Sequence, residues 1–253
     1  MKVLPLFKSH YSLGRSILTL ETPDSCVEDG PNSVINLATK NGIDKVFLVE
    51  ENMSSFLQAY TNCKAAKLHL VYGVRMMICP DIEEKTEDSL GKSCKYIIFA
   101  KNTDGYKNLI NIYSLAAKQG FYYQPRIDFK TLAQHWNNDN LLLAIPFYDS
   151  FIHKNSLSYS LCVPEMGFTE PVFFVEDNGL PFDDIIQEKI ENYSKGKHEI
   201  LKAKSIYYEF RNDFSTYLTC RCINNRSLLS SPKINHMCSE EFCFESWKEQ
   251  DGR

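Results

Sequence analysis

The feature that most constrains the fold is an alternation of short apolar runs with segments of helical periodicity. Seven runs are short and rich in β-branched or aromatic side chains, which favours strands. These predicted strands cover residues 3–7, 45–49, 69–77, 96–100, 141–145, 172–175 and 200–207. Such an alternation is typical of βα units and therefore of a mostly parallel sheet.

Four segments between these runs have the spacing of amphipathic helices. They cover residues 32–40, 53–65, 103–119 and 181–194. The third is the clearest, because its apolar residues recur at helical intervals from Tyr106 to Ala117. Gly120 is predicted to end it as the residue beyond the C-cap. Residues 81–92 are predicted to form a solvated loop, and residues 239–253, with five acids and two bases, a surface helix or tail.

Chain length and topology together indicate one α/β domain. About seven strands that alternate with helices in 253 residues are best accommodated by closure of the sheet into a barrel. The sequence contains no internal repeat and no linker-like boundary. We therefore predict a single domain over residues 1–253, which is within the range of one large core.

Charge and composition exclude several classes of protein. The chain has 28 Lys and Arg residues against 32 Asp and Glu residues. It therefore lacks the overall positive charge that binds nucleic acid regardless of base sequence. No apolar run approaches the roughly 20 residues of a membrane-spanning helix. Lys8 and His10 interrupt the apolar N-terminus before a secretion signal can form. The nine cysteines are an odd number, as expected of reduced thiols in the cytoplasm.

A family resemblance is carried by residues 100–128, AKNTDGYKNLINIYSLAAKQGFYYQPRID. This string resembles a signature segment of the polymerase and histidinol phosphatase (PHP) domain of bacterial DNA polymerase III α subunits. Shorter similar segments follow the same order over nearly the whole chain. The resemblance implies a distorted seven-stranded (β/α) barrel with metals at one mouth, in a domain that stabilises the polymerase and docks a proofreading exonuclease. The sequence contains none of the family's polymerase core, and we expect this chain alone not to polymerise.

The metal ligands implied by the resemblance are mostly replaced. Active members of the family use His, Asp, Glu and Cys side chains to hold metals that activate a water molecule. The corresponding positions here are Leu6, Lys8, Glu50, Glu51, Arg75, Lys95, Phe147, Lys204, Ser205 and Tyr207. Lys and Arg only donate hydrogen bonds, and Leu and Phe carry no ligand atom. Glu50 and Glu51 remain as plausible ligands, but neighbours on one strand point to opposite faces.

We therefore predict no catalytic residues, no bound metal and no cofactor. The favoured interpretation is a replication-associated module without enzymatic activity, acting as a scaffold or as a partner of a polymerase core or proofreading exonuclease. The alternative is a stand-alone metal-dependent phosphoesterase or exonuclease whose site is rebuilt around Glu50 and Glu51, and metal content distinguishes the two. If positive side chains replace the metals, at least one of Lys8, Arg75 and Lys95 should form a salt bridge with Glu50 or Glu51.

A basic segment interleaved with aromatic residues covers residues 195–233. It carries eight Lys or Arg against three acids, and such a composition suits contact with single-stranded DNA or with a partner protein. The candidate contact residues are Lys195, Lys197, Lys202, Lys204, Arg211 and Arg221. The alternative interpretation, which we favour, is a solvated face over buried aromatic rings.

A second set of potential metal ligands lies near the C-terminal end of the chain. Cys220, Cys222, His236, Cys238 and Cys243 are residue types that bind zinc. Their spacing matches no common zinc finger, and two cysteines at i and i+2 on a strand would face opposite sides. Unrelated thiols are therefore the favoured interpretation.

Overall fold

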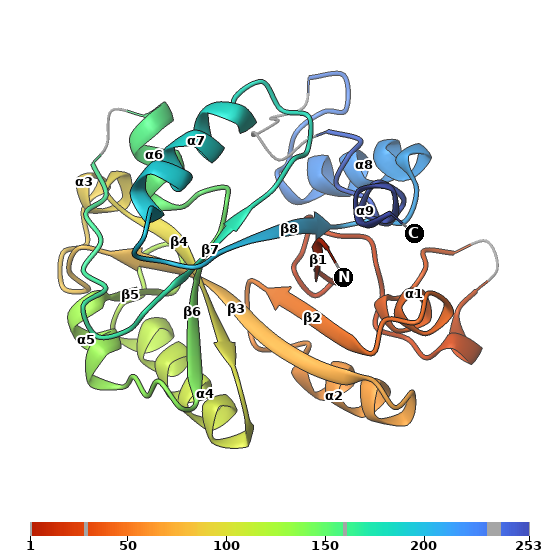
Figure 1. Cartoon of the computed structure of the whole chain (residues 1–253), viewed down its shortest axis with the longest axis horizontal. Helices are drawn as coiled ribbons and strands as arrows, with labels where there is room; N and C mark the ends of the chain where they lie inside the picture. Colours follow the sequence, from red (N-terminus) through yellow and green to blue (C-terminus); the bar gives the residue numbers. More distant parts are fainter. Residues whose placement is uncertain (1, 28–29, 159–160, 232–238, 253) are drawn as a thin grey trace. The chain divides into compact units, whose positions relative to one another are not determined.

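A computed structural model describes residues 2–27, 30–158, 161–231 and 239–252, and these contain eight strands and nine α-helices (Figure 1). The strands are β1 (Leu4–Phe7), β2 (Lys45–Glu50), β3 (His69–Cys79), β4 (Cys94–Ala100), β5 (Arg126–Asp128), β6 (Leu141–Ile145), β7 (Val172–Val175) and β8 (Ile200–Ile206). The helices are α1 (Val34–Lys40), α2 (Phe56–Ala65), α3 (Glu87–Gly91), α4 (Thr103–Lys118), α5 (Phe129–Gln134), α6 (Phe151–Leu157), α7 (Asp183–Ser194), α8 (Phe214–Asn224) and α9 (Phe244–Asp251). The predicted α/β class is confirmed.

The chain forms two compact units. The first unit comprises residues 1–72, 176–183 and 202–253, and the second comprises residues 73–175 and 184–201. Strands β3 and β8 each contribute residues to both units. The single-domain interpretation stays a prediction, and the two units are described separately below.

The first unit is built on the parallel strands β2, β1 and β8, in that order. Leu6 of β1 is opposite Phe47 on one side and Ser205 on the other. Because all three strands run in the same direction, their carboxyl ends lie at one edge of the sheet. The residues that follow β1 and β2, Lys8 and Glu51, are thus brought to that edge by the backbone alone.

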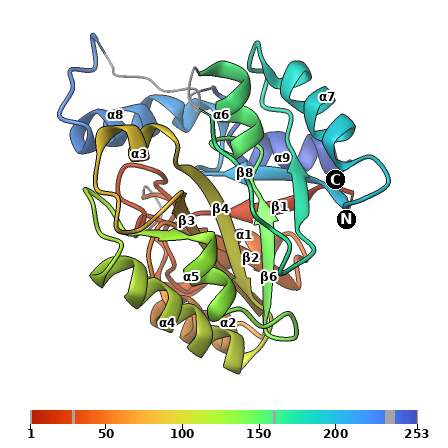
Figure 2. The same cartoon turned by 90° about the vertical axis from the view of Figure 1, so that its left-hand side faces the viewer.

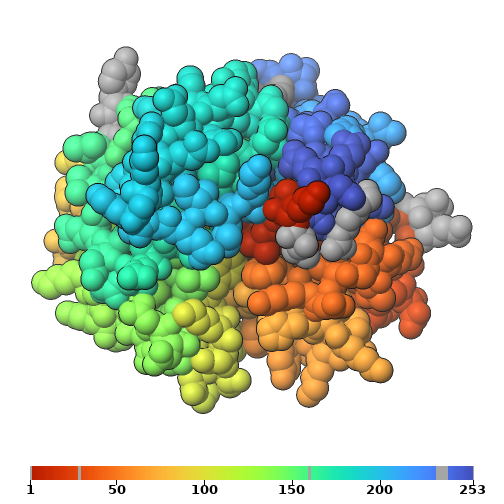
Figure 3. Space-filling model, viewed as in Figure 1, coloured from red at the N-terminus to blue at the C-terminus, as the bar shows by residue number. Residues whose placement is uncertain are grey.

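In the first unit, helix α9 packs against the first residues of the chain. Trp247 is fully buried, and its indole Nε1 donates a hydrogen bond to the carbonyl oxygen of Val3 at 2.9 Å. In the space-filling view, the blue C-terminal segment adjoins the red N-terminal segment (Figure 3). The predicted helix in residues 239–253 is confirmed, but it is no free tail, because Phe244 and Trp247 anchor it in the core.

The second unit contains a mixed sheet with the strand order β7, β6, β4, β3, β5. The pairs β6–β7 and β3–β5 are parallel, whereas β4 is antiparallel to both β3 and β6. The pairings β1–β2, β1–β8, β3–β5 and β6–β7 are parallel, so the prediction of a mostly parallel sheet is confirmed except at β4. Helices α4 and α5 both contact β5 on this sheet (Figure 2).

The strongly periodic elements agree with their predicted positions to within a few residues, whereas several short ones were missed. Residues 81–92 are not simply a solvated loop, because Ile82 is buried and α3 begins after Thr86, whose hydroxyl accepts a hydrogen bond from Ser89 N at 3.1 Å. Gly120 follows α4 as predicted but is not in the left-handed region. A side chain there would instead place Cβ at 1.9 Å from the Arg126 carbonyl oxygen.

Two further observations bear on the sequence analysis. Among the described residues, no helix combines the length and the apolar character that crossing a bilayer demands. The eight cysteines that fall within the described part of the chain are all free thiols.

Replacing Gly105 by alanine tests the packing of α4 on β6. A Cβ at Gly105 would lie 2.1 Å from the carbonyl oxygen of Asn140, so Gly105→Ala should lower the free energy of unfolding by about 1–3 kcal/mol. Helix propensity alone would favour alanine by about 1 kcal/mol. Denaturant unfolding measures the change.

The matched control is Gly167→Ala, where a Cβ meets no atom within 4 Å. Its free energy of unfolding should change by less than about 1 kcal/mol. An equally stable Gly105→Ala protein would contradict the described approach of α4 to Asn140.

Candidate functional site

A partly buried ion pair lies at the carboxyl edge of β1 and β2. The Nζ atom of Lys8 is 2.6 Å from Oε1 of Glu51. Lys8 is only 2% exposed, and the side chain of Glu51 is 24% exposed. The prediction that a positive side chain from the replaced ligand set pairs with Glu50 or Glu51 is confirmed.

Glu50 lies beside this pair and is completely buried. Its Oε1 accepts hydrogen bonds from Ser9 N at 3.0 Å and from Ser9 Oγ at 2.5 Å. Its Oε2 accepts a short hydrogen bond from Ser12 Oγ, which itself accepts one from Glu51 N at 2.9 Å. Lys8, Ser9, Ser12, Glu50 and Glu51 are called the Lys8–Glu51 cluster below. Glu51 lies one residue beyond β2, and both carboxylates contact the segment 8–12.

Burial controls the protonation of Glu50. Desolvation raises the pKa of this carboxyl group above its ordinary value, against the opposing effects of hydrogen bonds from Ser12 and Ser9 and of the Lys8 charge. With both glutamates ionised, the Lys8–Glu51 cluster carries one excess negative charge. A proton on Glu50 would make the cluster neutral.

The β8 side of the edge is also filled by hydrogen bonds within the protein. Leu6 is buried, and Ser205, its neighbour in register, donates from N at 2.8 Å and from Oγ at 2.9 Å to the buried carboxylate of Glu176. Asn178 Nδ2 donates to the same carboxylate at 3.1 Å. Ser205 therefore serves as a donor to Glu176, and this use of its hydroxyl competes with any role as a ligand.

Lys204 and Tyr207 have structural partners. Successive residues of a strand face opposite sides, so Lys204 points away from Ser205, and its Nζ donates to the carbonyl oxygen of Asp177 at 2.7 Å. Burial lowers the pKa of Lys204. The ring of Tyr207 stacks on Phe242 with the centroids 5.3 Å apart.

The other replaced positions gather around Asp149 in the second unit. The Nη2 atom of Arg75 donates to Asp149 Oδ2 at 3.0 Å and to the carbonyl oxygen of Tyr148 at 2.8 Å. Lys95 N donates to the carbonyl oxygen of Asp149 at 2.8 Å. Phe147 is completely buried and packs edge-on against Tyr148. Arg75 thus pairs with an aspartate that the sequence analysis did not include.

These side chains do not fit the metal cluster that the resemblance implies. Among the residues that the structure describes, no three His, Cys, Asp or Glu side chains gather where they could hold an ion. Lys8 and Arg75 bring positive charge to positions where ligands were expected. The serines that bind Glu50 were missed because serine is common in loops. The partners Asp149 and Glu176 were missed because neither lies at a ligand position of the family.

The basic segment 195–233 does not form one continuous surface. Lys204 and Arg221 are buried, and Arg221 Nη1 donates to Tyr217 Oη at 2.8 Å. Arg211 binds Glu241 at 2.9 Å and Glu249 at 2.7 Å. The exposed candidates are Lys195, Lys197 and Lys202.

The aromatic rings of this segment are mostly unable to stack on bases. Tyr207, Tyr208 and Tyr217 are buried, whereas Phe210 is exposed. The arrangement agrees with the favoured interpretation of a solvated face over buried rings. Lys233 lies outside the described residues, and contact of the exposed lysines with DNA or a partner stays a prediction.

The cysteine set near the C-terminus is dispersed over different elements. Cys220 and Cys222 lie on helix α8, not on a strand as assumed. Cys243 is the N-cap of α9, where its Sγ accepts a hydrogen bond from Ser246 N at 3.4 Å. His236 and Cys238 lie outside the described residues, so the structure does not test the complete set.

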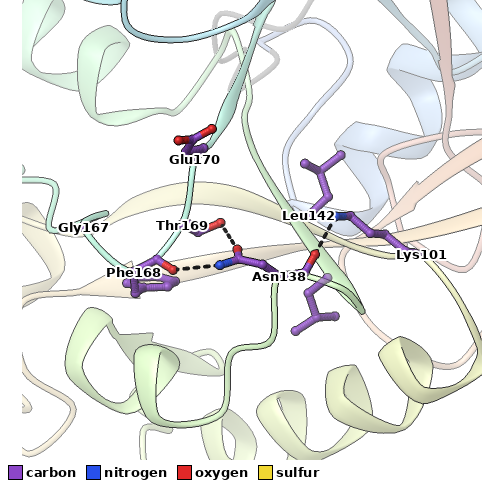
Figure 4. Close-up of a pocket in the computed structure, with 8 residues that line it drawn as sticks. Lys101, Asn138, Leu142, Gly167, Phe168, Thr169 and Glu170 are labelled. Atoms are coloured by element: carbon purple, nitrogen blue, oxygen red, sulfur yellow. Dashed lines mark hydrogen bonds between the residues drawn. The ribbon is translucent and has the colours of Figure 1, made fainter.

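A polar cavity of about 540 Å³ in the second unit was not foreseen from the sequence (Figure 4). Asn138 organises it: its carbonyl oxygen accepts from Lys101 Nζ at 2.6 Å, and its Oδ1 accepts from Thr169 Oγ1 at 2.7 Å. Lys101 and Glu170 are the ionisable residues among those that line it. The lining contains no His or Cys, and its one carboxylate is that of Glu170.

Comparison with known proteins identifies what the chain is similar to. A family model described as the PHP domain matches residues 26–211. The DNA polymerase III subunit alpha of Borreliella burgdorferi is 26% identical over 234 residues, which are 86% of this chain and 20% of that protein. The corresponding subunit of Treponema pallidum is 31% identical over 42% of this chain and 10% of its own length. The chain thus spans about one fifth or less of these relatives, and the family match confirms the predicted distorted barrel type.

The ion pair between Lys8 and Glu51 can be tested by a double-mutant cycle. Glu51→Gln leaves the buried Lys8 ammonium without this partner, and the free energy of unfolding should fall by up to about 3 kcal/mol. Lys8→Met combined with Glu51→Gln should cost less than Glu51→Gln alone, because the double variant buries no unpaired ammonium.

The exposed pair Lys107–Asp104, 3.0 Å apart, provides the control. Lys107→Met and Asp104→Asn should each change the free energy of unfolding by less than about 1 kcal/mol. Strictly additive effects at Lys8 and Glu51 would show that the two side chains do not interact.

Proposed function

Because the chain belongs to the PHP domain family, we propose that it is a DNA replication module without metal-dependent catalysis. Its role in this proposal is that of a cytoplasmic scaffold or partner-binding subunit. The relatives are named as DNA polymerase III α subunits, which supports a link to replication. A polymerase core or a proofreading exonuclease is the proposed partner.

The observation that carries the proposal is the Lys8–Glu51 cluster. The salt bridge from Lys8 and the hydrogen bonds from Ser9 and Ser12 engage Glu50 and Glu51, the two carboxylates that a rebuilt metal site would need. A metal would have to displace the Lys8 ammonium, which is itself buried. The energetic cost of that displacement favours an ion-free site.

The second unit supports the same interpretation by an independent contact. Arg75 occupies a position where the family has a glutamate ligand, and its guanidinium is bound to Asp149 and to the Tyr148 carbonyl oxygen. A guanidinium cannot coordinate a metal at neutral pH, because it remains protonated. The alternative function, a rebuilt phosphoesterase, has no comparable supporting contact among the described residues.

Metal content and hydrolysis test the loss of catalysis. The protein, purified without chelators and offered Zn²⁺ or Mn²⁺, should retain no stoichiometric metal by elemental analysis and should hydrolyse neither p-nitrophenyl phosphate nor DNA ends. Two metals per chain with metal-dependent turnover would support the phosphoesterase instead. Loss of that turnover in Glu50→Gln, with an unchanged fold, would assign it to this site.

Sedimentation of the protein with separately purified polymerase III α core or proofreading exonuclease tests the partner role. The proposal predicts a co-sedimenting complex with at least one of them. Binding of neither would remove the partner role and leave the absence of catalysis standing.

A further inference from the structure

Three consecutive aromatic residues form an exposed turn after α4 in the second unit. Phe121 is 50% exposed and Tyr123 is 76% exposed, although large aromatic side chains stabilise a fold most when they are buried. Tyr123 has φ of 59°, which is a left-handed conformation that bulky side chains rarely adopt. The backbone therefore presents the Tyr123 ring to solvent at some conformational cost.

Arg126 holds the base of this turn. The Arg126 guanidinium lies 5.2 Å from the centroid of the Tyr122 ring and donates from Nε to the Gly120 carbonyl oxygen at 3.1 Å. Tyr122 and Tyr123 meet edge to face with centroids 4.7 Å apart. These contacts hold the turn in place, so the fold itself keeps Phe121 and Tyr123 exposed.

Arg126 also fastens an acidic segment beside the aromatic rings. Its Nη2 donates to the Glu84 carbonyl oxygen at 3.2 Å, and its Nη1 donates to Ser89 Oγ at 3.1 Å. Residues 81–92 carry five acids and two lysines, and Lys92 is paired with Asp88. Apart from Asp88, the exposed acids of this segment are Asp81, Glu83, Glu84 and Glu87. Together with the three aromatic residues, they make up what we call the aromatic–acidic surface.

We propose that the aromatic–acidic surface binds an arginine-bearing basic segment of a protein partner. A guanidinium is attracted both by the face of an aromatic ring and by nearby carboxylates. The Arg126 guanidinium over the Tyr122 ring is an example of the ring contact within the chain. Exposed rings alone would also suit nucleic acid, but the carboxylates repel phosphate groups. The inference goes beyond the proposed function and holds for any partner that carries such a segment.

Peptide binding by the full chain tests the proposal. The probe is a fluorescein-labelled peptide with four arginines spaced by glycine and serine, followed by anisotropy at about 0.15 M salt. The expected result is binding that Phe121→Ser together with Tyr123→Gly weakens about tenfold. Glycine at position 123 tolerates the left-handed backbone, so this variant should fold. The control is Tyr60→Ser, which removes a 49% exposed ring from α2 and should leave the affinity unchanged.

A second pair of variants tests the carboxylates. Glu83→Gln with Glu87→Gln should weaken peptide binding at least about threefold and reduce its dependence on salt, whereas Asp184→Asn with Glu188→Gln, which changes exposed acids on α7, should not. No binding by the folded protein would overturn the proposal, as would an equal loss in either control. Tighter binding of a poly-dT oligonucleotide, or a dimer that the Tyr123 variant dissociates, would assign the surface to DNA or to a second copy instead.

Discussion

The ammonium of Lys8, held almost wholly out of water at the end of β1, sets the requirements for the surrounding site. A buried charge is tolerated only beside an opposite charge or several oriented dipoles. Parallel pairing of β1 with β2 supplies the opposite charge, because it places Glu51 Oε1 at 2.6 Å from Lys8 Nζ. It also brings Glu50 close enough to interact with the Lys8 charge. The backbone topology thus determines which side chains balance the charge.

The same physical solution recurs in the second unit with different residues. Arg75 brings a guanidinium to a buried strand, where its Nη2 donates to Asp149 and to the Tyr148 carbonyl oxygen. A metal ion and a positive side chain each supply charge that nearby carboxylates can balance. They differ in that a side chain cannot activate water as a metal does.

Sequence reasoning located the strands with clear apolar runs and the strongly periodic helices, and it failed on strand direction and on elements without a clear pattern. The strands 141–145 and 172–175 were predicted with the bounds observed for β6 and β7. The antiparallel course of β4 was not foreseen, because apolar periodicity carries no information on strand direction. Helix α3 is too short to show a helical period. A salt bridge from Lys8, Arg75 or Lys95 to Glu50 or Glu51 was foreseen because the family resemblance places these positions at one barrel mouth, and the observed pair is Lys8–Glu51. The partner Asp149 was not foreseen.

The protonation of Glu50 in the presence and absence of zinc tests the central claim most directly. The carboxyl carbon of Glu50, assigned by its loss in Glu50→Gln, is followed by NMR from neutral to acidic pH. The account predicts a titration midpoint above the ordinary value of 4.5 that added Zn²⁺ leaves unchanged, because the Lys8–Glu51 cluster is complete without an ion. A midpoint at or below that value, or one that falls when Zn²⁺ is added, would contradict it.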